Sequence, residues 1–242
     1  ENLAEIRTRR SGGRAARRPG RQNQPVNSPP YIIRNVPPYE VLNHEGLDQI
    51  ESNAETILAE TGVEFREDAE SLALLKQAGA DIDGELVRFP RGMCRQIIQA
   101  TAPAEFTQVA RNPERSVRIG GKNTVLVPAY GSPFVRDLDK GRRYATLEDF
   151  QNFIKLAYLS PYLHHSGGTI CEPVDVPVSN RHLDMVYSHM RFSDKPFMGS
   201  VTAPERAEDT IEMARILFGE DFVGEHTVIT SLINANSPLV WD

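Results

Sequence analysis

Apolar residues recur at helical spacing along residues 43–103. A capping residue precedes the first apolar run, glycines follow the first two runs, and a proline suits the first turn of the third. An Asp-Gly pair between short apolar pieces indicates a tight turn. These signals are Asn43, Gly62, Gly79, Pro90 and Asp83-Gly84. The stretch therefore predicts three helices, with the turn before the third.

Between residues 105 and 145 the apolar runs become short. Residues 105–111 and 116–128 have the pattern of strands and are separated by Asn112-Pro113. Residues 134–145 predict a hairpin that turns through Asp139-Lys140-Gly141. We therefore expect β-structure to follow the helical stretch.

A regular alternation of strand and helix begins near residue 146. Capping-box patterns at Thr146–Asp149 and Thr202–Glu205 predict the starts of two helices, with Thr202 as an N-cap. The helix between them has an apolar face made of Leu183, Val186, Tyr187 and Met190. The strand candidates are residues 162–170, 196–200 and 227–233. Strand starts recur about every 35 residues, the length of one βα unit, which predicts a parallel sheet.

The alternation predicts an α/β fold, the N-terminal part of a (β/α)8 TIM barrel behind a small helical and hairpin region. A small open doubly wound sheet is the alternative, but no GxGxxG motif or P-loop follows the first strand. We divide the chain into an arm (1–30), a helical and hairpin region (31–122) and the first half of the barrel (123–242). Because the pattern stops after the fourth predicted strand, we expect the remaining βα units to follow Asp242.

Charge is distributed unevenly along the chain, whose net charge is −6. Residues 1–25 carry seven arginines and two glutamates, a net charge of +5, which leaves −11 for the rest. The Arg-, Gly- and Pro-rich composition predicts that residues 1–30 are disordered. A basic arm also fits an acidic partner or nucleic acid, although no aromatic residue precedes Tyr31 to stack on a base.

Composition excludes several classes of protein. Cys94 and Cys171 form neither a disulfide framework nor a metal-binding pattern. No run of about 18 apolar residues could span a membrane, and no secretory signal is visible. We therefore expect a cytoplasmic protein.

Candidate chemistry lies where the predicted strands end, because the carboxyl ends of barrel strands and the loops after them form the active sites of such folds. The clusters at these ends are residues 128–134, 164–172, 198–202 and 234–238. Tyr130 offers a ring face to a quaternary ammonium, or packs. Glu172 offers a carboxylate to a cation or for acid–base chemistry, or is solvated. Asn234 and Asn236 offer amides to a polar ligand, or cap a following helix.

The cluster at residues 164–172 holds the most reactive groups. His164 and His165 are adjacent on a strand and point to opposite faces, so a metal site made by both is not expected. Gly167-Gly168 forms a tight turn or brings backbone amides to a phosphate. Cys171 is expected to be structural, because nothing in the sequence indicates a lowered thiol pKa.

Three motifs occur in order along the chain. They are HHSGGTICEPVD at 164–175, DKPFMGS at 194–200 and INANSPL at 233–239. With the Arg/Gly tail and a proline-rich entry, they resemble the trimethylamine methyltransferase family over essentially the whole chain. The resemblance implies a (β/α)8 barrel that moves a methyl group from a methylated amine, such as trimethylamine or glycine betaine. The acceptor is the Co(I) of a corrinoid (cobalamin) carried by a partner protein docked over the barrel mouth.

Trimethylamine enzymes of this family use a pyrrolysine in the second half of the barrel, and other members act on quaternary amines. We therefore expect the catalytic group beyond Asp242, no directly bound metal, and a homo-oligomer. Position and residue chemistry make Tyr130 and Glu172 candidates for gripping the cation.

The other candidates would hold a substrate carboxylate or order nearby side chains, and they are His165, Asn234 and Asn236. Two other functions stay open. One is a barrel lyase or hydrolase with a phosphate- or metal-binding loop at 164–172, and the other is an interaction protein with a nucleic-acid-binding arm.

Overall fold

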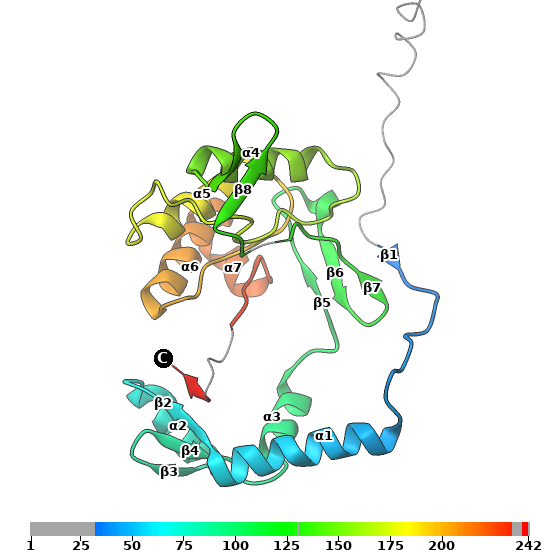
Figure 1. Cartoon of the computed structure of the whole chain (residues 1–242), viewed down its shortest axis with the longest axis vertical. Coiled ribbons are helices and arrows are strands. Elements are labelled where there is room, and N and C mark those ends of the chain that lie inside the picture. Colours follow the sequence, from blue (N-terminus) through cyan, green and yellow to red (C-terminus); the bar gives the residue numbers. More distant parts are fainter. Residues whose placement is uncertain (1–31, 130, 234–238, 242) are drawn as a thin grey trace, which may run out of the picture.

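The computed structural model describes residues 32–129, 131–233 and 239–241. These residues form a mixed α/β structure, as expected from the alternating pattern. Figure 1 shows two groups of elements, one with α1, α2, α3 and a small sheet, the other with α4 to α7 and extended segments. The predicted arm at 1–30 lies outside the described residues.

Helix α1 (His44–Thr56) begins at Asn43, as predicted. The Asn43 side chain accepts a hydrogen bond from the Gly46 amide at 2.9 Å. The helix continues as a π-helical turn, η2 (Ile57–Thr61), and ends at Gly62, which has a φ of 81°. This conformation favours glycine, and a side chain there would also strike the carbonyl oxygen of Val87.

The next two helices agree with the pattern except at one start. Helix α2 (Ala69–Ala78) ends at Gly79 in the left-handed conformation, as predicted. Helix α3 (Met93–Thr101) begins after Pro90, so placing Pro90 in its first turn was wrong. The carbonyl of Pro90 instead accepts a hydrogen bond from the Met93 amide at 3.0 Å, because the intervening residues form a turn that leads into the helix.

A four-stranded sheet lies beside these helices. Its strands are β2 (Val63–Phe65), β3 (Asp81–Asp83), β4 (Leu86–Arg88) and β12 (Val240–Trp241), in the order β12-β2-β4-β3. The β3–β4 turn contains the predicted Asp83-Gly84 pair. Strand β12 runs parallel to β2, and the ring of Trp241 stacks on that of Phe65 with centroids 6.0 Å apart. The end of the chain thus joins this sheet (Figure 1).

Three further pairs of strands are antiparallel. They are β5 (Glu105–Gln108) with β6 (Val117–Gly120), β1 (Ile32–Ile33) with β7 (Asn123–Thr124), and β8 (Phe134–Asp137) with β9 (Gly141–Tyr144). The last pair confirms the hairpin predicted at 134–145. Because β1 pairs with β7, residues 32–33 lie beside residues 123–124, which come much later in the sequence.

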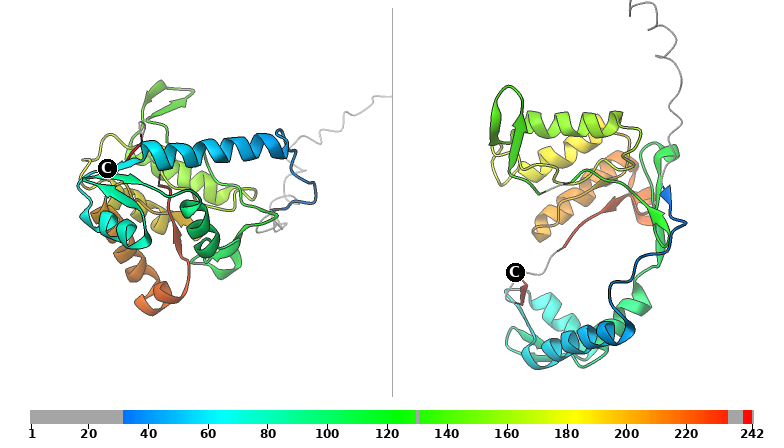
Figure 2. Two further views of the ribbon diagram at one scale, coloured as in Figure 1. Left: turned by 90° about the horizontal axis from the view of Figure 1, so that it is seen from below. Right: turned by 45° about the vertical axis from the view of Figure 1, so that its right-hand side comes forward.

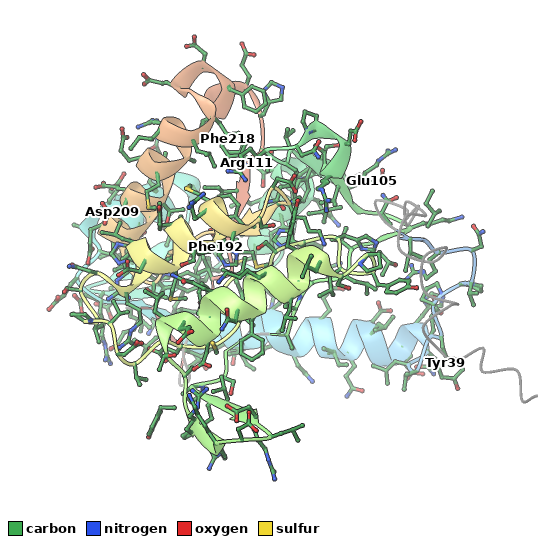
Figure 3. The ribbon with its side chains drawn as sticks, turned by 90° about the horizontal axis from the view of Figure 1, so that it is seen from above. Tyr39, Glu105, Arg111, Phe192, Asp209 and Phe218 are labelled. Atoms are coloured by element: carbon green, nitrogen blue, oxygen red, sulfur yellow. The ribbon has the colours of Figure 1, made fainter. Side chains whose placement is uncertain are left out.

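Helices α4 (Leu147–Leu159), α5 (Arg181–Phe192) and α6 (Pro204–Phe218) lie side by side, and the short α7 (Glu220–Glu225) follows α6 (Figures 2 and 3). The predicted capping box of Thr146 and Asp149 is confirmed at the start of α4. The second predicted cap is wrong, because Ala203 is the N-cap of α6 and the Thr202 hydroxyl accepts a hydrogen bond from Arg206 instead.

The buried face of α5 also differs from the prediction. Tyr187 was expected on this face but is 54% exposed. The face instead contains two histidines, because polar rings that find hydrogen-bond partners can replace apolar ones in a core. The buried residues of α5 are His182, Val186, Ser188, His189 and Met190.

Four extended segments run parallel to one another, in sequence order, on the inner side of these helices. We name them segment 1 (125–129 with 131–132), segment 2 (163–171), segment 3 (195–199, with β10, Phe197–Met198) and segment 4 (227–231, with β11, Ile229–Thr230). The amide of residue 164 bonds to residue 126, that of 198 to 167, and that of 199 to 230, at 2.8–2.9 Å. The expected parallel arrangement is therefore present.

The β-strands within these segments are shorter than predicted, since among the four segments only β10 and β11 form a regular parallel strand pair. The described residues contain no closed barrel, so the barrel and the boundary at residue 122 stay predictions. No helix among them is long and apolar enough to cross a membrane. The cytoplasmic location and the homo-oligomer also stay predictions.

Candidate functional site

The carboxyl ends of the four segments meet along one edge, which we call the carboxyl-end edge (131–132, 168–172, 199–200 and 231). The amide of Glu172 donates to the Ser132 carbonyl at 3.0 Å, and the Gly131 amide donates to Thr169 at 2.8 Å. These bonds bring the predicted clusters at 128–134 and 164–172 together.

Glu172 presents a carboxylate at this edge. Its side chain is 49% exposed and forms an ion pair with Arg181 at the start of α5. Arg181 is held in turn by the carbonyl of Val176, to which it donates at 3.0 Å. The ion pair compensates part of the charge of Glu172, whose predicted contact with a substrate cation stays a prediction.

His165 lies deeper, below the carboxyl-end edge, and is 1% exposed. Its Nδ1 accepts a hydrogen bond from the Gly167 amide at 2.9 Å. Its Nε2 lies 3.1 Å from Oε1 of Gln108, and this pair requires the ring to donate there. Both nitrogens are therefore engaged by the protein. This hydrogen-bonded environment fits the second role expected for His165, that of ordering nearby side chains. Its predicted contact with substrate stays a prediction.

Gln108 extends this buried hydrogen-bond network across two segments. Its amide nitrogen donates to the carbonyls of Phe197 at 2.8 Å and Val228 at 3.3 Å. The side chain is fully buried, and each of its polar atoms has a partner. Gln108 thus fastens the β5–β6 hairpin to segments 3 and 4 through bonds that are stronger in the interior than in water.

Burial keeps His165 uncharged. Desolvation, and to a smaller extent the neighbouring His189, lower its pKa to about 3. The neutral ring has one donor and one acceptor nitrogen, which match its two partners. A proton taken up at Nδ1 would remove the acceptor for Gly167. His165 therefore serves as a fixed hydrogen-bonding group at neutral pH.

A second buried histidine supports the same loop from helix α5. Nδ1 of His189 accepts a hydrogen bond from the Ser166 hydroxyl at 2.7 Å, and Nε2 donates to the Gly168 carbonyl at 2.9 Å. The ring stacks on Phe197 with centroids 5.9 Å apart. His165 and His189 together hold the amide of Gly167 and the carbonyl of Gly168.

The adjacent histidines have different hydrogen-bond partners. Nδ1 of His164 accepts from the Leu126 amide at 2.9 Å, on the side of segment 1. The amides of Ser166 and Gly167 also bond within the protein, to the Pro196 carbonyl and to His165. These contacts give no support to a phosphate loop at 164–172.

Segments 3 and 4 approach each other closely at Gly199. A Cβ there would lie 2.3 Å from Cγ2 of Thr210 and 3.0 Å from Cγ2 of Ile229. The Thr210 hydroxyl accepts from the Ser200 amide at 3.2 Å and donates to its carbonyl at 3.1 Å. Glycine is needed here so that α6 can support the edge directly.

The remaining predicted residues divide into two groups. Tyr130, Asn234 and Asn236 lie outside the described residues, so their roles stay predictions. Cys171 is 1% exposed, and burial raises the pKa of its thiol to about 11. A thiol that stays protonated at neutral pH fits the expected structural role.

The sequence did not single out several buried polar residues, among them Gln108, His189 and Lys195. His189 could have been found, because it lies three positions after the apolar Val186 on the same helical face. Lys195 donates from Nζ to the carbonyls of Ala157, Ser160 and Leu163 at 2.7–2.9 Å. It anchors the end of α4, a role that no local pattern indicates.

Neither a metal cluster nor the cavity beside α1 lies at the carboxyl-end edge in the part of the chain that the structure describes. No group of three or more His, Cys, Asp or Glu residues within the described part of the chain is arranged to hold a metal. A cavity of about 370 Å³ lies between α1 and α3, where Glu51 and Arg95 form an ion pair. The elements around it are remote from the carboxyl-end edge (Figure 1), so we do not assign the chemistry to it.

The chain is similar to two characterised methyltransferases. It is 46% identical over 208 residues to the glycine betaine methyltransferase of Desulfitobacterium hafniense (strain Y51), covering 86% of this chain and 43% of that protein. It is 23% identical over 205 residues to the L-carnitine:corrinoid methyltransferase of Eubacterium limosum, covering 78% of this chain and 41% of that protein. The chain thus spans about two fifths of the length of these curated relatives.

A family model described as trimethylamine methyltransferase (MTTB) matches residues 10–242, nearly all of the chain. This match confirms the resemblance inferred from the three motifs at 164–175, 194–200 and 233–239. The structure shows what two of those motifs form. The motif at 164–175 contains the glycine loop held by histidines, and the motif at 194–200 contains the strand anchored by Lys195. The chain belongs to the trimethylamine methyltransferase family.

Proposed function

We propose that the protein transfers a methyl group from a methylated amine to the Co(I) of a corrinoid carried by a separate protein. The observation that carries this proposal is the 46% identity to a glycine betaine methyltransferase over 208 residues. The second relative, whose name specifies a corrinoid, supports the nature of the acceptor. Glycine betaine is accordingly the first substrate to test.

The chemistry fits a quaternary ammonium substrate. The bond between the methyl carbon and nitrogen breaks, the nitrogen keeps the electron pair, and a neutral amine leaves. The two electrons of the new cobalt–carbon bond come from the Co(I) of the acceptor. Because the leaving amine is neutral, no general acid is needed, and the protein must bind, orient and dehydrate the cation.

The carboxyl-end edge offers groups for these tasks. Glu172 supplies a negative charge for the ammonium group, and desolvation would strengthen that attraction. The loop at Gly167 and Gly168, held by two neutral histidines, gives the edge a fixed backbone. We further infer that the four parallel segments belong to a (β/α)8 barrel, in which carboxyl ends face the active site.

A methyl-transfer assay tests the proposal. The intact protein is mixed with a corrinoid protein reduced to Co(I) and, separately, with glycine betaine, L-carnitine or trimethylamine. We expect the absorbance of Co(I) to disappear and the demethylated amine to form with glycine betaine. Absence of methyl transfer from all three amines would overturn the proposal.

A further inference from the structure

Hairpin β8–β9 has two faces of different character. Alternation along paired strands places Phe134 and Arg136 of β8 on one face with Arg142 and Tyr144 of β9, their partners in the register. Val135 and Arg143 point to the other face. We call the first the outer face and the second the inner face of the hairpin.

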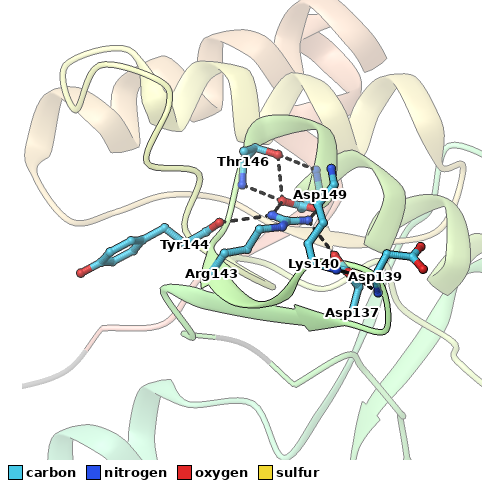
Figure 4. Close-up of polar contacts among 7 residues, drawn as sticks. All are labelled: Asp137, Asp139, Lys140, Arg143, Tyr144, Thr146 and Asp149. Atoms are coloured by element: carbon cyan, nitrogen blue, oxygen red, sulfur yellow. Dashed lines mark hydrogen bonds and ion pairs between the residues drawn. The ribbon is translucent and has the colours of Figure 1, made fainter.

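The inner face is fixed to the body of the protein. Val135 is buried in a core with Phe150, Ile154 and Cys171. Arg143 forms ion pairs with Asp137 within the hairpin and with Asp149 in the first turn of α4 (Figure 4). These contacts hold the hairpin in one orientation relative to α4.

The outer face is exposed and carries positive charge. Arg136 lies directly opposite Arg142 across the strand pair, an arrangement in which like charges destabilise a hairpin. The Arg142 guanidinium lies 3.8 Å from the centroid of the Phe134 ring, and the Tyr144 ring packs 4.7 Å from Phe134. No carboxylate within the described residues forms an ion pair with either arginine.

This combination is typical of a protein-binding surface. Arginine and tyrosine are enriched among the residues that contribute most to protein–protein affinity. Leu138 at the turn is fully exposed, and Tyr144 is 58% exposed. An acidic partner surface would relieve the repulsion between the two arginines. We therefore expect the partner surface to be negatively charged.

The position of the hairpin indicates which partner it binds. It follows segment 1 directly, and Ala145 at its base is bonded to a residue just after segment 2, since the Val174 amide donates to the Ala145 carbonyl at 3.0 Å. It therefore stands at the rim of the carboxyl-end edge and projects outward from beside helix α4 (Figure 3). A methyl acceptor must cover this edge to reach a substrate bound there.

We propose that the outer face of hairpin β8–β9, with Arg136 and Arg142 at its centre, docks an acidic surface of the protein that carries the corrinoid. This inference rests on the proposed function. A second copy of this chain is the competing occupant. The location at the rim of the site, beside Glu172, favours the methyl acceptor over that second copy.

Substitution Arg136→Glu tests the proposal without weakening the hairpin, because the new carboxylate would face Arg142 and replace a repulsion by an attraction. The intact enzyme is titrated with the Co(I) corrinoid protein by calorimetry. We expect the Kd to rise about tenfold, as for loss of a charged contact at an interface. The KM for the methylated amine, at saturating corrinoid protein, should stay unchanged.

Lys122→Glu is the matched control, since Lys122 is an exposed cation between β6 and β7 and its reversal changes the net charge equally. An unchanged Kd for R136E, or an equal rise for K122E, overturns the proposal. Light scattering that shows R136E to dissociate an oligomer, with Kd unchanged, would assign the hairpin to a second copy instead. If the wild-type enzyme binds and methylates no corrinoid protein, the proposed function itself fails.

Discussion

The guanidinium of Arg143 in β9 donates two hydrogen bonds to the carboxylate of Asp149 in α4, one of them at 2.7 Å. The same carboxylate accepts from the amide and the hydroxyl of Thr146 at 2.9 and 2.8 Å. One side chain thus completes the cap of α4 and ties the hairpin to that helix (Figure 4). The relationship explains how a protruding hairpin can be rigid.

Substitution Asp149→Ala should lower the free energy of unfolding by about 1–2 kcal/mol at neutral pH, because the helix loses its capping box. The pKa of Asp149 is lowered well below its ordinary range, first by the hydrogen bond from Arg143 and then by those from Thr146. Its contribution is therefore complete above the unfolded pKa of about 3.9 and decreases as the pH falls below it.

Urea unfolding at about pH 7 and about pH 3 measures this difference between wild type and D149A. The difference should be larger at the higher pH. Glu148→Ala is the matched control, since Glu148 is an exposed carboxylate in the same turn. A difference that does not change with pH would show that Asp149 contributes through packing alone.

His189→Ala should destabilise the protein by about 3 kcal/mol, because it removes a buried ring and leaves the Gly168 carbonyl without a donor. Desolvation lowers the pKa of His189 to about 4, against the opposing effect of its bond to Gly168. As the pH falls, this histidine therefore takes up a proton in the unfolded chain before it does so in the folded protein. The free energy of unfolding decreases as the pH falls below about 6.5.

The variant should show a weaker decline in the free energy of unfolding between about pH 6.5 and pH 4 than wild type. Denaturant titrations across this range provide the measurement. Ser166→Ala, which removes the donor to Nδ1 but keeps the ring, should retain the decline. Identical pH profiles for wild type and H189A would contradict the assignment.

Gly199→Ala should cost about 1–3 kcal/mol, because the new methyl group overlaps Cγ2 of Thr210. Thr210→Ser deletes that methyl group and keeps the hydroxyl that bonds to Ser200. In a double-mutant cycle followed by urea unfolding, G199A should cost at least about 0.5 kcal/mol less in the T210S background. Strict additivity would show that the backbone, or Ile229, sets the requirement for glycine.

Glu172→Gln should change stability little, since its ion pair with Arg181 is half exposed on the carboxylate side. If Glu172 holds the substrate cation, the KM for glycine betaine should rise about tenfold, the effect of losing one charged contact. Steady-state kinetics of the intact enzyme provides the measurement. Arg181→Gln frees the carboxylate and should not raise this KM, so equal increases for both variants would indicate a structural role.

The local elements were largely readable from the sequence. The cap at Asn43, the helix stop at Gly79 and the capping box at Thr146 are interactions within a few residues, and the side chains that make them are visible in order along the chain. Thr202 shows the limit of this reasoning, because the hydroxyl of a predicted capping residue can form a hydrogen bond with another group. Its hydroxyl binds Arg206 instead.

The candidate site was predictable only in part. Glu172 lies at the end of segment 2, as its position after a predicted strand implied, because the chain direction decides which residues follow a parallel strand, and its role stays a prediction. The buried partners of His165 were not predictable, because Gln108 lies 57 positions away and no periodicity relates the two residues. The same holds for Lys195, whose acceptors lie at the end of a different helix.

Order along the chain thus established the elements, the parallel alternation and the family, because helical and strand periods depend on neighbouring residues. Only the folded arrangement decided that two histidines support the glycine loop and that Trp241 packs on Phe65. These contacts join residues that the chain must first bring together, and their free energy comes from burial and hydrogen bonding in a shared interior. Distance along the sequence does not encode them.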